Sequence, residues 1–169
     1  IENWPNWPSR LVNIFGPTGC GKTHLINILK NKIQSKIISA KDINSETLLK
    51  FKILECLIID DFNNNIEEKL LYSIINAAVQ DNKYLIISSS VSLKKFKIKL
   101  NDLSSRLTSF VEIGIDLPTD DLIRVILTKS FSDKQIKISK KNIEYILKNI
   151  DRSYEKINLF ANSIDKMSL

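Results

Sequence analysis

Long hydrophobic runs are absent from this chain of 169 residues. No apolar stretch approaches the ~20 residues that a membrane-spanning helix needs. The start carries no signal-peptide pattern. These absences exclude a helical membrane protein. The chain opens on Ile1 rather than Met, so we expect that a preceding segment has been trimmed.

Cysteine, histidine and arginine are scarce. The two cysteines, Cys20 and Cys56, are too few for a disulfide framework. One lies in a glycine-rich loop and the other begins an apolar strand, so we expect reduced thiols and a cytoplasmic protein. A single histidine, His24, makes no metal-binding cluster. Only four of the 25 basic residues are arginines, which makes each of them more informative.

The remaining composition is ordinary for a globular protein, with 43% hydrophobic and 26% charged residues. The net charge of +6 suits an acidic partner such as nucleic acid, although it is modest and spread along the chain. The length allows one α/β domain with a small helical appendage.

Short apolar runs alternate with segments of helical spacing. Strands are expected at Leu11–Phe15, Lys36–Ser39, Cys56–Ile59, Tyr84–Ile87 and Val111–Ile115. Helices are expected at Lys22–Ile33, at Ser45–Phe51 with Ser45 as its N-cap, and at Glu67–Gln80. This alternation predicts an α/β fold, a parallel sheet with helices on both faces.

The pattern changes after Pro118. Three helices are expected there without any strand between them, at Asp120–Phe131, Lys140–Asn149 and Arg152–Met167. We therefore predict two domains, an α/β domain over residues 1–117 and a small all-helical lid over 118–169.

A phosphate-binding loop joins the first predicted strand to the first helix. The segment matches G-x-x-x-x-G-K-[ST] in full, and it consists of Gly16, Pro17, Thr18, Gly19, Cys20, Gly21, Lys22 and Thr23. In such a loop backbone N–H groups surround the phosphates, the lysine reaches the β and γ phosphates, and the threonine hydroxyl ligates Mg²⁺. The sequence therefore predicts a site for ATP or ADP. His24 adjoins this site, although a lone histidine is more often a packing or surface residue.

Two acidic residues end the third predicted strand. We expect Asp60 to hold Mg²⁺ through water and Asp61 to orient the attacking water. Paired acids are also common in turns, so this assignment depends on the complete phosphate loop.

The ordered motifs resemble the bacterial DnaA family of AAA+ proteins. The segments that carry this resemblance are GPTGCGKTHLINIL, LIIDD and LNDLSSRLTSFVEIGIDLP. WPNWPSRLVNIFGP and DRSYEKINLFANSIDKMSL look most like Hda, the short regulatory homologue of DnaA. The resemblance implies the AAA+ fold, a five-stranded parallel sheet in the order 5-1-4-3-2 with a helical lid. It also implies that Arg106 is an arginine finger that reaches a neighbouring subunit's nucleotide; the alternative is a surface salt bridge.

Two positions depart from the family pattern. The sensor 1 position after the fourth strand is Ser90, and the sensor 2 arginine falls on Glu155, between Arg152 and Lys156. A carboxylate beside phosphates repels them. We expect nucleotide binding with weak intrinsic ATP hydrolysis.

Two further segments invite alternative interpretations. We expect the run from Lys94 to Lys99 to be a solvated face; the alternative is a contact for phosphate backbones. Trp4 and Trp7 either border the adenine or pack against the first strand. We expect packing for the tryptophans.

The resemblance implies a regulator of chromosomal replication initiation that promotes ATP hydrolysis on DnaA through Arg106. In the family this requires the DNA-loaded sliding clamp, held by an N-terminal motif that this chain lacks. A homo-oligomer is possible, and neither membrane association nor sequence-specific DNA binding is expected. The alternatives are the AAA+ core of a DnaA initiator and a helicase-loader-type ATPase.

Overall fold

The computed structural model describes residues 6–163. Contacts divide these residues into two compact units, 6–16 with 22–115 and 17–21 with 116–163. Within residues 6–163, no helix is both long enough and apolar enough to cross a membrane.

The first unit contains a five-stranded sheet in the order β2-β3-β4-β1-β5. All four neighbouring pairs are parallel. The strands are β1 (Leu11–Phe15), β2 (Ser35–Ser39), β3 (Cys56–Phe62), β4 (Tyr84–Ser89) and β5 (Val111–Gly114). Taken from the other edge, this order is the predicted 5-1-4-3-2, so the predicted topology is confirmed.

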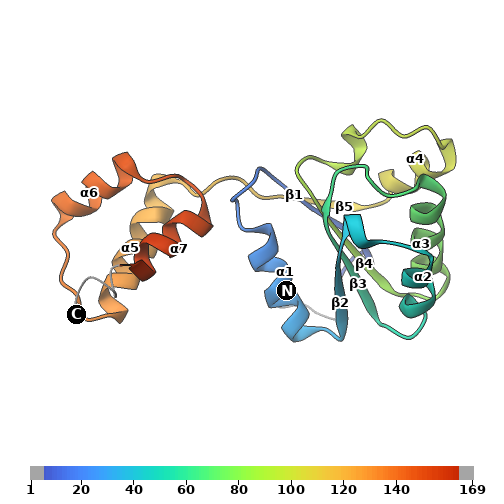
Figure 1. Cartoon of the computed structure of the whole chain (residues 1–169), viewed down its shortest axis with the longest axis horizontal. Coiled ribbons are helices and arrows are strands. Elements are labelled where there is room, and N and C mark those ends of the chain that lie inside the picture. The colour runs from blue at the N-terminus through green and yellow to red at the C-terminus, as the bar shows by residue number, and fades with distance from the viewer. Residues whose placement is uncertain (1–5, 164–169) are drawn as a thin grey trace. The chain divides into compact units, whose positions relative to one another are not determined.

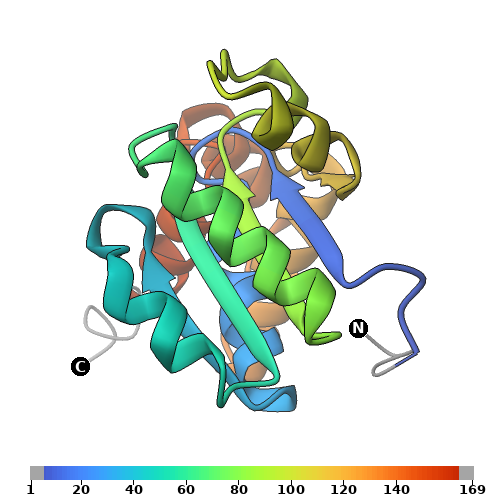
Figure 2. The same ribbon diagram turned by 90° about the vertical axis from the view of Figure 1, so that its right-hand side faces the viewer.

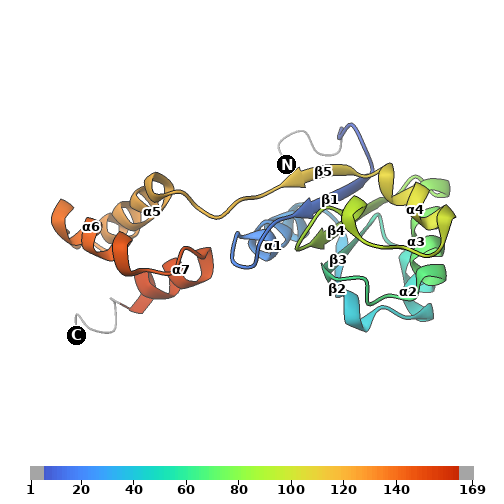
Figure 3. The same cartoon turned by 90° about the horizontal axis from the view of Figure 1, so that it is seen from above.

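Helices cover both faces of the sheet, as predicted. One face carries α1 (Lys22–Lys32). The other carries α2 (Ser45–Phe51), α3 (Glu68–Gln80) and α4 (Asn101–Thr108), and Figures 1 and 3 show the two layers on either side of the strands. Figure 2 looks onto the face that α2 and α3 cover. Two short 3-10 turns, η1 (Ala40–Asp42) and η2 (Leu93–Lys95), follow β2 and β4.

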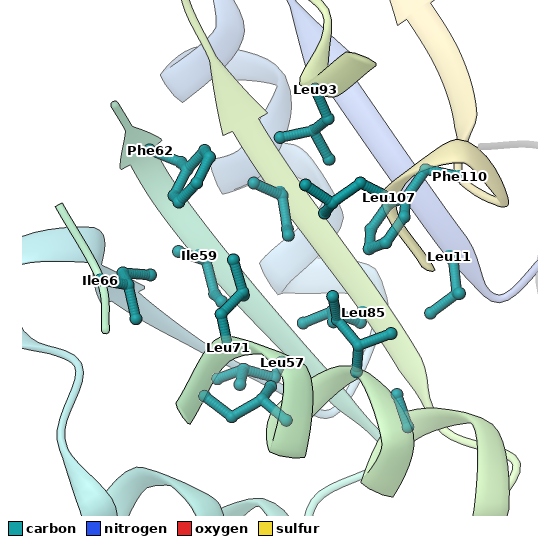
Figure 4. Packing of buried hydrophobic residues seen from close by; sticks show 14 of the residues in the cluster. Leu11, Leu57, Ile59, Phe62, Ile66, Leu71, Leu85, Leu93, Leu107 and Phe110 are labelled. Carbon is teal, nitrogen blue, oxygen red and sulfur yellow. The ribbon is translucent and has the colours of Figure 1, made fainter. Parts of the chain in front are cut away.

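Alternating strand residues build two separate cores, because successive side chains of a strand point to opposite faces. Leu57, Ile59 and Leu85 pack in the cluster beneath α2, α3 and α4 (Figure 4). Cys56, Ile58 and Ile86 pack instead with residues of α1. Burial, assisted by the charge of Glu55, raises the pKa of the Cys56 thiol to about 12. Both cysteines are buried, and neither forms a disulfide with a described residue, which agrees with the predicted reduced thiols.

The second unit contains α5 (Asp120–Asp133), α6 (Lys140–Asn149) and α7 (Tyr154–Ser163). Thr119 and Ser139 cap the first two helices through side-chain oxygens that accept from Leu122 N and Asn142 N. The three helices share an apolar cluster of Ile123, Leu127, Phe131, Ile143, Leu147 and Ile157. The three predicted helices are confirmed; the predicted end at Met167 lies outside the described residues.

Three local predictions were wrong or incomplete. The N-cap of α2 is Asn44 rather than Ser45, and its side chain accepts from Thr47 N in a capping box. The strand β3 continues through Asp60 and Asp61 to Phe62, with an irregular register after Ile59. The helix α4 was not predicted, and no side chain caps its N-terminus.

Replacing Leu85 with Ala tests the core beneath α3. Leu85 is fully buried in β4, so we expect Leu85→Ala to lower the free energy of unfolding by about 2–5 kcal/mol. Leu49→Ala is the matched control, because Leu49 is 65% exposed and a surface change costs within ~0.5 kcal/mol. Urea unfolding measures both values, and equal values for the two variants would contradict this packing.

Candidate functional site

The carboxyl ends of β1, β4 and β3 are adjacent, because β4 lies between the other two strands. In open parallel sheets, ligands bind beyond the carboxyl ends of the strands, where the connections diverge. The glycine-rich loop follows β1, the two aspartates end β3, and a run of serines ends β4. The topology therefore brings the sequence-predicted groups to one edge of the sheet.

The loop after β1 requires glycine at two positions. Gly19 has φ +84° and Gly21 has φ +101°, in a region that other residues rarely adopt. Within the second unit, Gly19 O accepts a hydrogen bond from Tyr154 N at 2.9 Å. A Cβ at Gly19 would lie 2.4 Å from Ser153 Cβ. A side chain at Gly19 is therefore excluded by both backbone conformation and space.

The cationic and hydroxyl groups of the loop lie at the start of α1. Lys22 Nζ donates to Gly16 O at 2.8 Å, so its ammonium lies beside the first residue of the loop. Thr23 Oγ1 donates to Asp60 Oδ2 at 3.3 Å. The hydroxyl and carboxylate predicted to serve Mg²⁺ are therefore adjacent. The side chain of His24 is exposed beside them.

The Asp60 carboxylate is held by three groups. Besides Thr23, Ser88 Oγ donates to Asp60 Oδ1, and Asp61 N donates to the same oxygen at 3.0 Å. Asp61 N also donates to Ser88 Oγ at 2.9 Å. Asp61 itself has φ +60°, and its side chain is exposed. A non-glycine residue held at positive φ beside these contacts is the kind of outlier found at functional sites.

Sequence reasoning missed Ser88. The structure places the side chain of Ser88 fully buried against Asp60, whereas Ser90, the predicted sensor 1 position, is exposed. Asn13 was also missed. Its amide donates to Ile87 O at 3.0 Å and to Ser89 Oγ at 2.9 Å, and its Oδ1 accepts from Leu93 N at 3.2 Å. A polar residue within an apolar strand was the available signal for Asn13.

The four arginines differ in their contacts. Arg10 donates to Asn82 O and lies over the Tyr84 ring. Arg124 forms ion pairs with Asp121 and Glu144, and Arg152 forms an ion pair with Asp120. Arg106, on α4, is exposed, and its guanidinium has no hydrogen bond or ion pair to any described residue.

The three residues considered for the sensor 2 position differ in what the structure shows of their side chains. The side chain of Glu155, the predicted sensor 2 position itself, lies outside what the structure describes. Arg152, its potential substitute, pairs with Asp120 at 3.0 Å. Lys156 is exposed.

The two tryptophans also differ. Trp4 lies outside the described residues. Trp7 packs against the buried cluster that Cys56, Ile58 and Ile86 form with residues of α1, and its ring meets Tyr84 edge to face, with ring centroids 6.0 Å apart. Packing, rather than a place beside the adenine, was the expectation for Trp7.

A family model described as RNA helicase matches residues 12–101, more than half of the chain. The chain belongs to this family. The match runs from β1 into the start of α4 and includes the glycine-rich loop and the acidic end of β3.

Individual curated proteins and solved structures show which members of this family the chain is similar to. The chromosomal replication initiator protein DnaA of Streptococcus uberis is 27% identical over 207 residues, covering 100% of this chain and 45% of DnaA. A structure of the replication initiator DnaA bound to AMPPCP and single-stranded DNA aligns with a TM-score of 0.73 and 20% identity, over 91% of this chain and 54% of that one. The RuvB Holliday junction branch migration motor of Thermotoga maritima aligns at 0.69 with 21% identity, over 93% and 54%.

The chain is therefore similar to DnaA, and it shares the AAA+ fold of the aligned structures. The predicted α/β AAA+ fold is confirmed. The chain spans under half the length of the curated DnaA that it matches.

Ser88 provides a direct test of the geometry around Asp60. Removing a group that orients a metal ligand typically costs 10–100-fold in metal affinity, so Ser88→Ala should weaken Mg²⁺-dependent binding of ATP by about tenfold. Ser90→Ala is the matched control, because its side chain is exposed. Calorimetric titration with and without Mg²⁺ measures the effect; equal affinities for the two variants would rule out a positioning role.

Proposed function

We propose that this domain binds ATP or ADP with Mg²⁺ and regulates chromosomal replication initiation in the manner of Hda, by promoting ATP hydrolysis on DnaA. The observation that carries the proposal is Arg106, an exposed guanidinium with no hydrogen bond or ion pair among the described residues. A planar cation presented on a surface helix suits a phosphate group on a neighbouring molecule.

The described residues fit a magnesium nucleotide. The positive φ values of Gly19 and Gly21 let the loop turn its backbone around an anion. The α1 N-terminus begins at Lys22, and helix N-termini attract phosphate. The Thr23 hydroxyl is proposed as an oxygen ligand and Asp60 as a carboxylate that holds Mg²⁺ through water, since Mg²⁺ usually takes one or two protein ligands together with phosphates and water.

The roles of the chain's own residues follow from this geometry. Loop residues 16–23 bind the phosphates, with Lys22 at the β and γ groups and His24 at the border of the site. Thr23 and Asp60 hold the metal, and Asp61 orients water. Residues 118–169 are proposed to be the helical lid domain of the family. The metal supplies charge neutralisation on the phosphates when it is bound.

Hydrolysis at the chain's own site is proposed to be slow. Ser90 stands at the sensor 1 position and Glu155 at the sensor 2 position, so two groups that contact phosphates in the family are replaced. The proposal therefore places the productive chemistry on DnaA, with Arg106 acting in trans and with the DNA-loaded sliding clamp as a further partner. The proposal also allows the domain to associate with copies of itself through α4, the helix that carries Arg106.

Steady-state ATP turnover tests the proposal against a free-standing ATPase such as a helicase loader. The native protein alone should turn over ATP near background, and ATP-bound DnaA with DNA-loaded clamp should raise total turnover well above that of DnaA alone. Rapid turnover without partners would favour the free-standing ATPase.

A second candidate is the AAA+ core of a DnaA initiator. It is favoured by the alignment of 100% of this chain with 45% of a DnaA. Binding to origin and random duplexes at physiological salt separates the two candidates. The regulator should bind the origin duplex and the random duplex equally, because base readout needs a recognition element in a groove. Preference for the origin sequence would favour the initiator.

A further inference from the structure

One polar side chain is buried inside β1, on the face of the sheet that α3 and α4 cover. Asn13 is fully buried. Leu11, two residues earlier on the same face, belongs to the apolar cluster there, together with Leu93 and Leu107, which Figure 4 labels. Moving an amide into an apolar interior is unfavourable unless its N–H and C=O groups find partners. The presence of Asn13 therefore needs an explanation beyond packing.

The Asn13 amide binds the chain around the end of β4. Its Nδ2 donates to Ile87 O at 3.0 Å and to Ser89 Oγ at 2.9 Å, which uses both N–H groups. Its Oδ1 accepts from Leu93 N at 3.2 Å. Ser89 Oγ in turn donates to Val91 O at 2.6 Å. One side chain thus fixes the last residues of β4 and the turn that follows them.

Ser88 lies between the two β4 residues that the Asn13 amide contacts. Successive side chains of a strand point to opposite faces, so the Ser88 hydroxyl lies on the face that α1 covers, as Ile86 does. There it donates to Asp60 Oδ1 and accepts from Asp61 N at 2.9 Å. These contacts cross the stretch where the register between β3 and β4 is irregular. Regular strand pairing therefore does not position Ser88 against Asp60.

We infer that Asn13 is a positioning residue for the Asp60 carboxylate. It acts through Ser88 from the opposite face of the sheet, because its amide holds the backbone on both sides of that serine. A buried polar network whose members are all hydrogen-bonded specifies one arrangement of the chain around it. The inference goes beyond the proposed function, since it assigns a role to a residue on the far face of the sheet from the Asp60 side chain.

Amide hydrogen exchange, followed by NMR, tests the inference without any ligand. Asn13→Leu keeps the side-chain size and removes the hydrogen bonds. The Asp61 N–H lies on β3, with β4 between it and Asn13. It should exchange about 5-fold faster relative to the Ile58 N–H, because a hydrogen bond that held it is weakened. Leu85→Ala is the matched control, since Leu85 is fully buried in the same cluster and its apolar side chain forms no hydrogen bond.

Calorimetry tests the consequence for the metal, and this readout rests on the proposed nucleotide site. Asn13→Leu should weaken ATP binding in Mg²⁺ by about tenfold, since groups that orient metal ligands contribute 10–100-fold, and should leave binding in EDTA unchanged. Asn13→Leu/Ser88→Ala should bind no more weakly than Ser88→Ala alone, because residues that act through one contact are not additive. Ser89→Ala removes one of the three Asn13 contacts and should show smaller changes in both measurements.

Each measurement has a result that would overturn the inference. Unchanged relative exchange of the Asp61 N–H in Asn13→Leu, or equal acceleration in Leu85→Ala, would mean that Asn13 only packs the core. Additive losses in the double variant, or equal losses with and without Mg²⁺, would also contradict it. If Asn13→Leu does not fold, Ser89→Ala decides through the same readouts. If the parent shows no Mg²⁺-dependent ATP binding, the proposed function fails, and the exchange of the Asp61 N–H still decides the inference.

Discussion

Arg106→Ala is expected to abolish stimulation of ATP hydrolysis on DnaA while leaving this domain folded and able to bind nucleotide. Arginine fingers contribute roughly 10³–10⁵-fold in rate, because a fixed cation stabilises charge on the transferring phosphoryl group. Arg106 is exposed and makes no side-chain contact among the described residues, so its loss should cost within ~0.5 kcal/mol of stability. Single-turnover hydrolysis on DnaA, with DNA-loaded clamp, measures the rate.

Two variants sharpen this prediction. Arg106→Lys should not restore stimulation, since an ammonium lacks the planar fork that spans two phosphate oxygens. Lys41→Ala removes an exposed cation from η1 and should stimulate as the parent does. If Arg106→Ala stimulates DnaA fully, the finger assignment is wrong and Arg106 is only a surface cation.

Lys22→Ala is expected to weaken ATP and ADP binding by about 10–100-fold, because hydrogen bonds to charged groups contribute roughly 1.5–3 kcal/mol. Lys22 begins α1, and its ammonium already lies over the loop, 2.8 Å from Gly16 O. Calorimetry measures both affinities. Lys32→Ala is the control, because it removes an exposed cation from the other end of the same helix.

Two results would contradict the assignment of residues 16–23 as a nucleotide site. If the parent shows no affinity at millimolar nucleotide, or if Lys22→Ala binds as tightly as Lys32→Ala, residues 16–23 do not hold phosphate in this domain.

The sheet and most helices were predictable because their apolar spacing is strong. The strand Leu11–Phe15 and the helix Ser45–Phe51 were placed with their bounds. The helix α4 was missed because it is eight residues long, buries only Leu103 and Leu107 and has no side-chain cap. The continuation of β3 was missed because Asp60 and Asp61 are typical of turns, whereas β2 and β4 pair with the strand around them.

The site was predictable only where one segment carries a whole motif. The phosphate loop and the aspartate pair are such segments, and the structure brings Thr23 and Asp60 together across 37 positions of sequence. Ser88 could not be separated from Ser89 and Ser90 in the sequence. Ser88 and Ser89 both lie within β4, and the contact of Ser88 with Asp60 depends on the irregular register between β3 and β4, which no local pattern encodes.

The most direct test of the account follows the nucleotide rather than the total turnover. DnaA is loaded with radiolabelled ATP, the native full-length protein containing this domain is loaded with unlabelled ADP, and the two are mixed with DNA-loaded clamp. Hydrolysis promoted in trans should give labelled ADP on DnaA, formed only when Arg106 is present. Labelled ATP that persists on DnaA, with hydrolysis seen only when the label is placed on this domain, would contradict it.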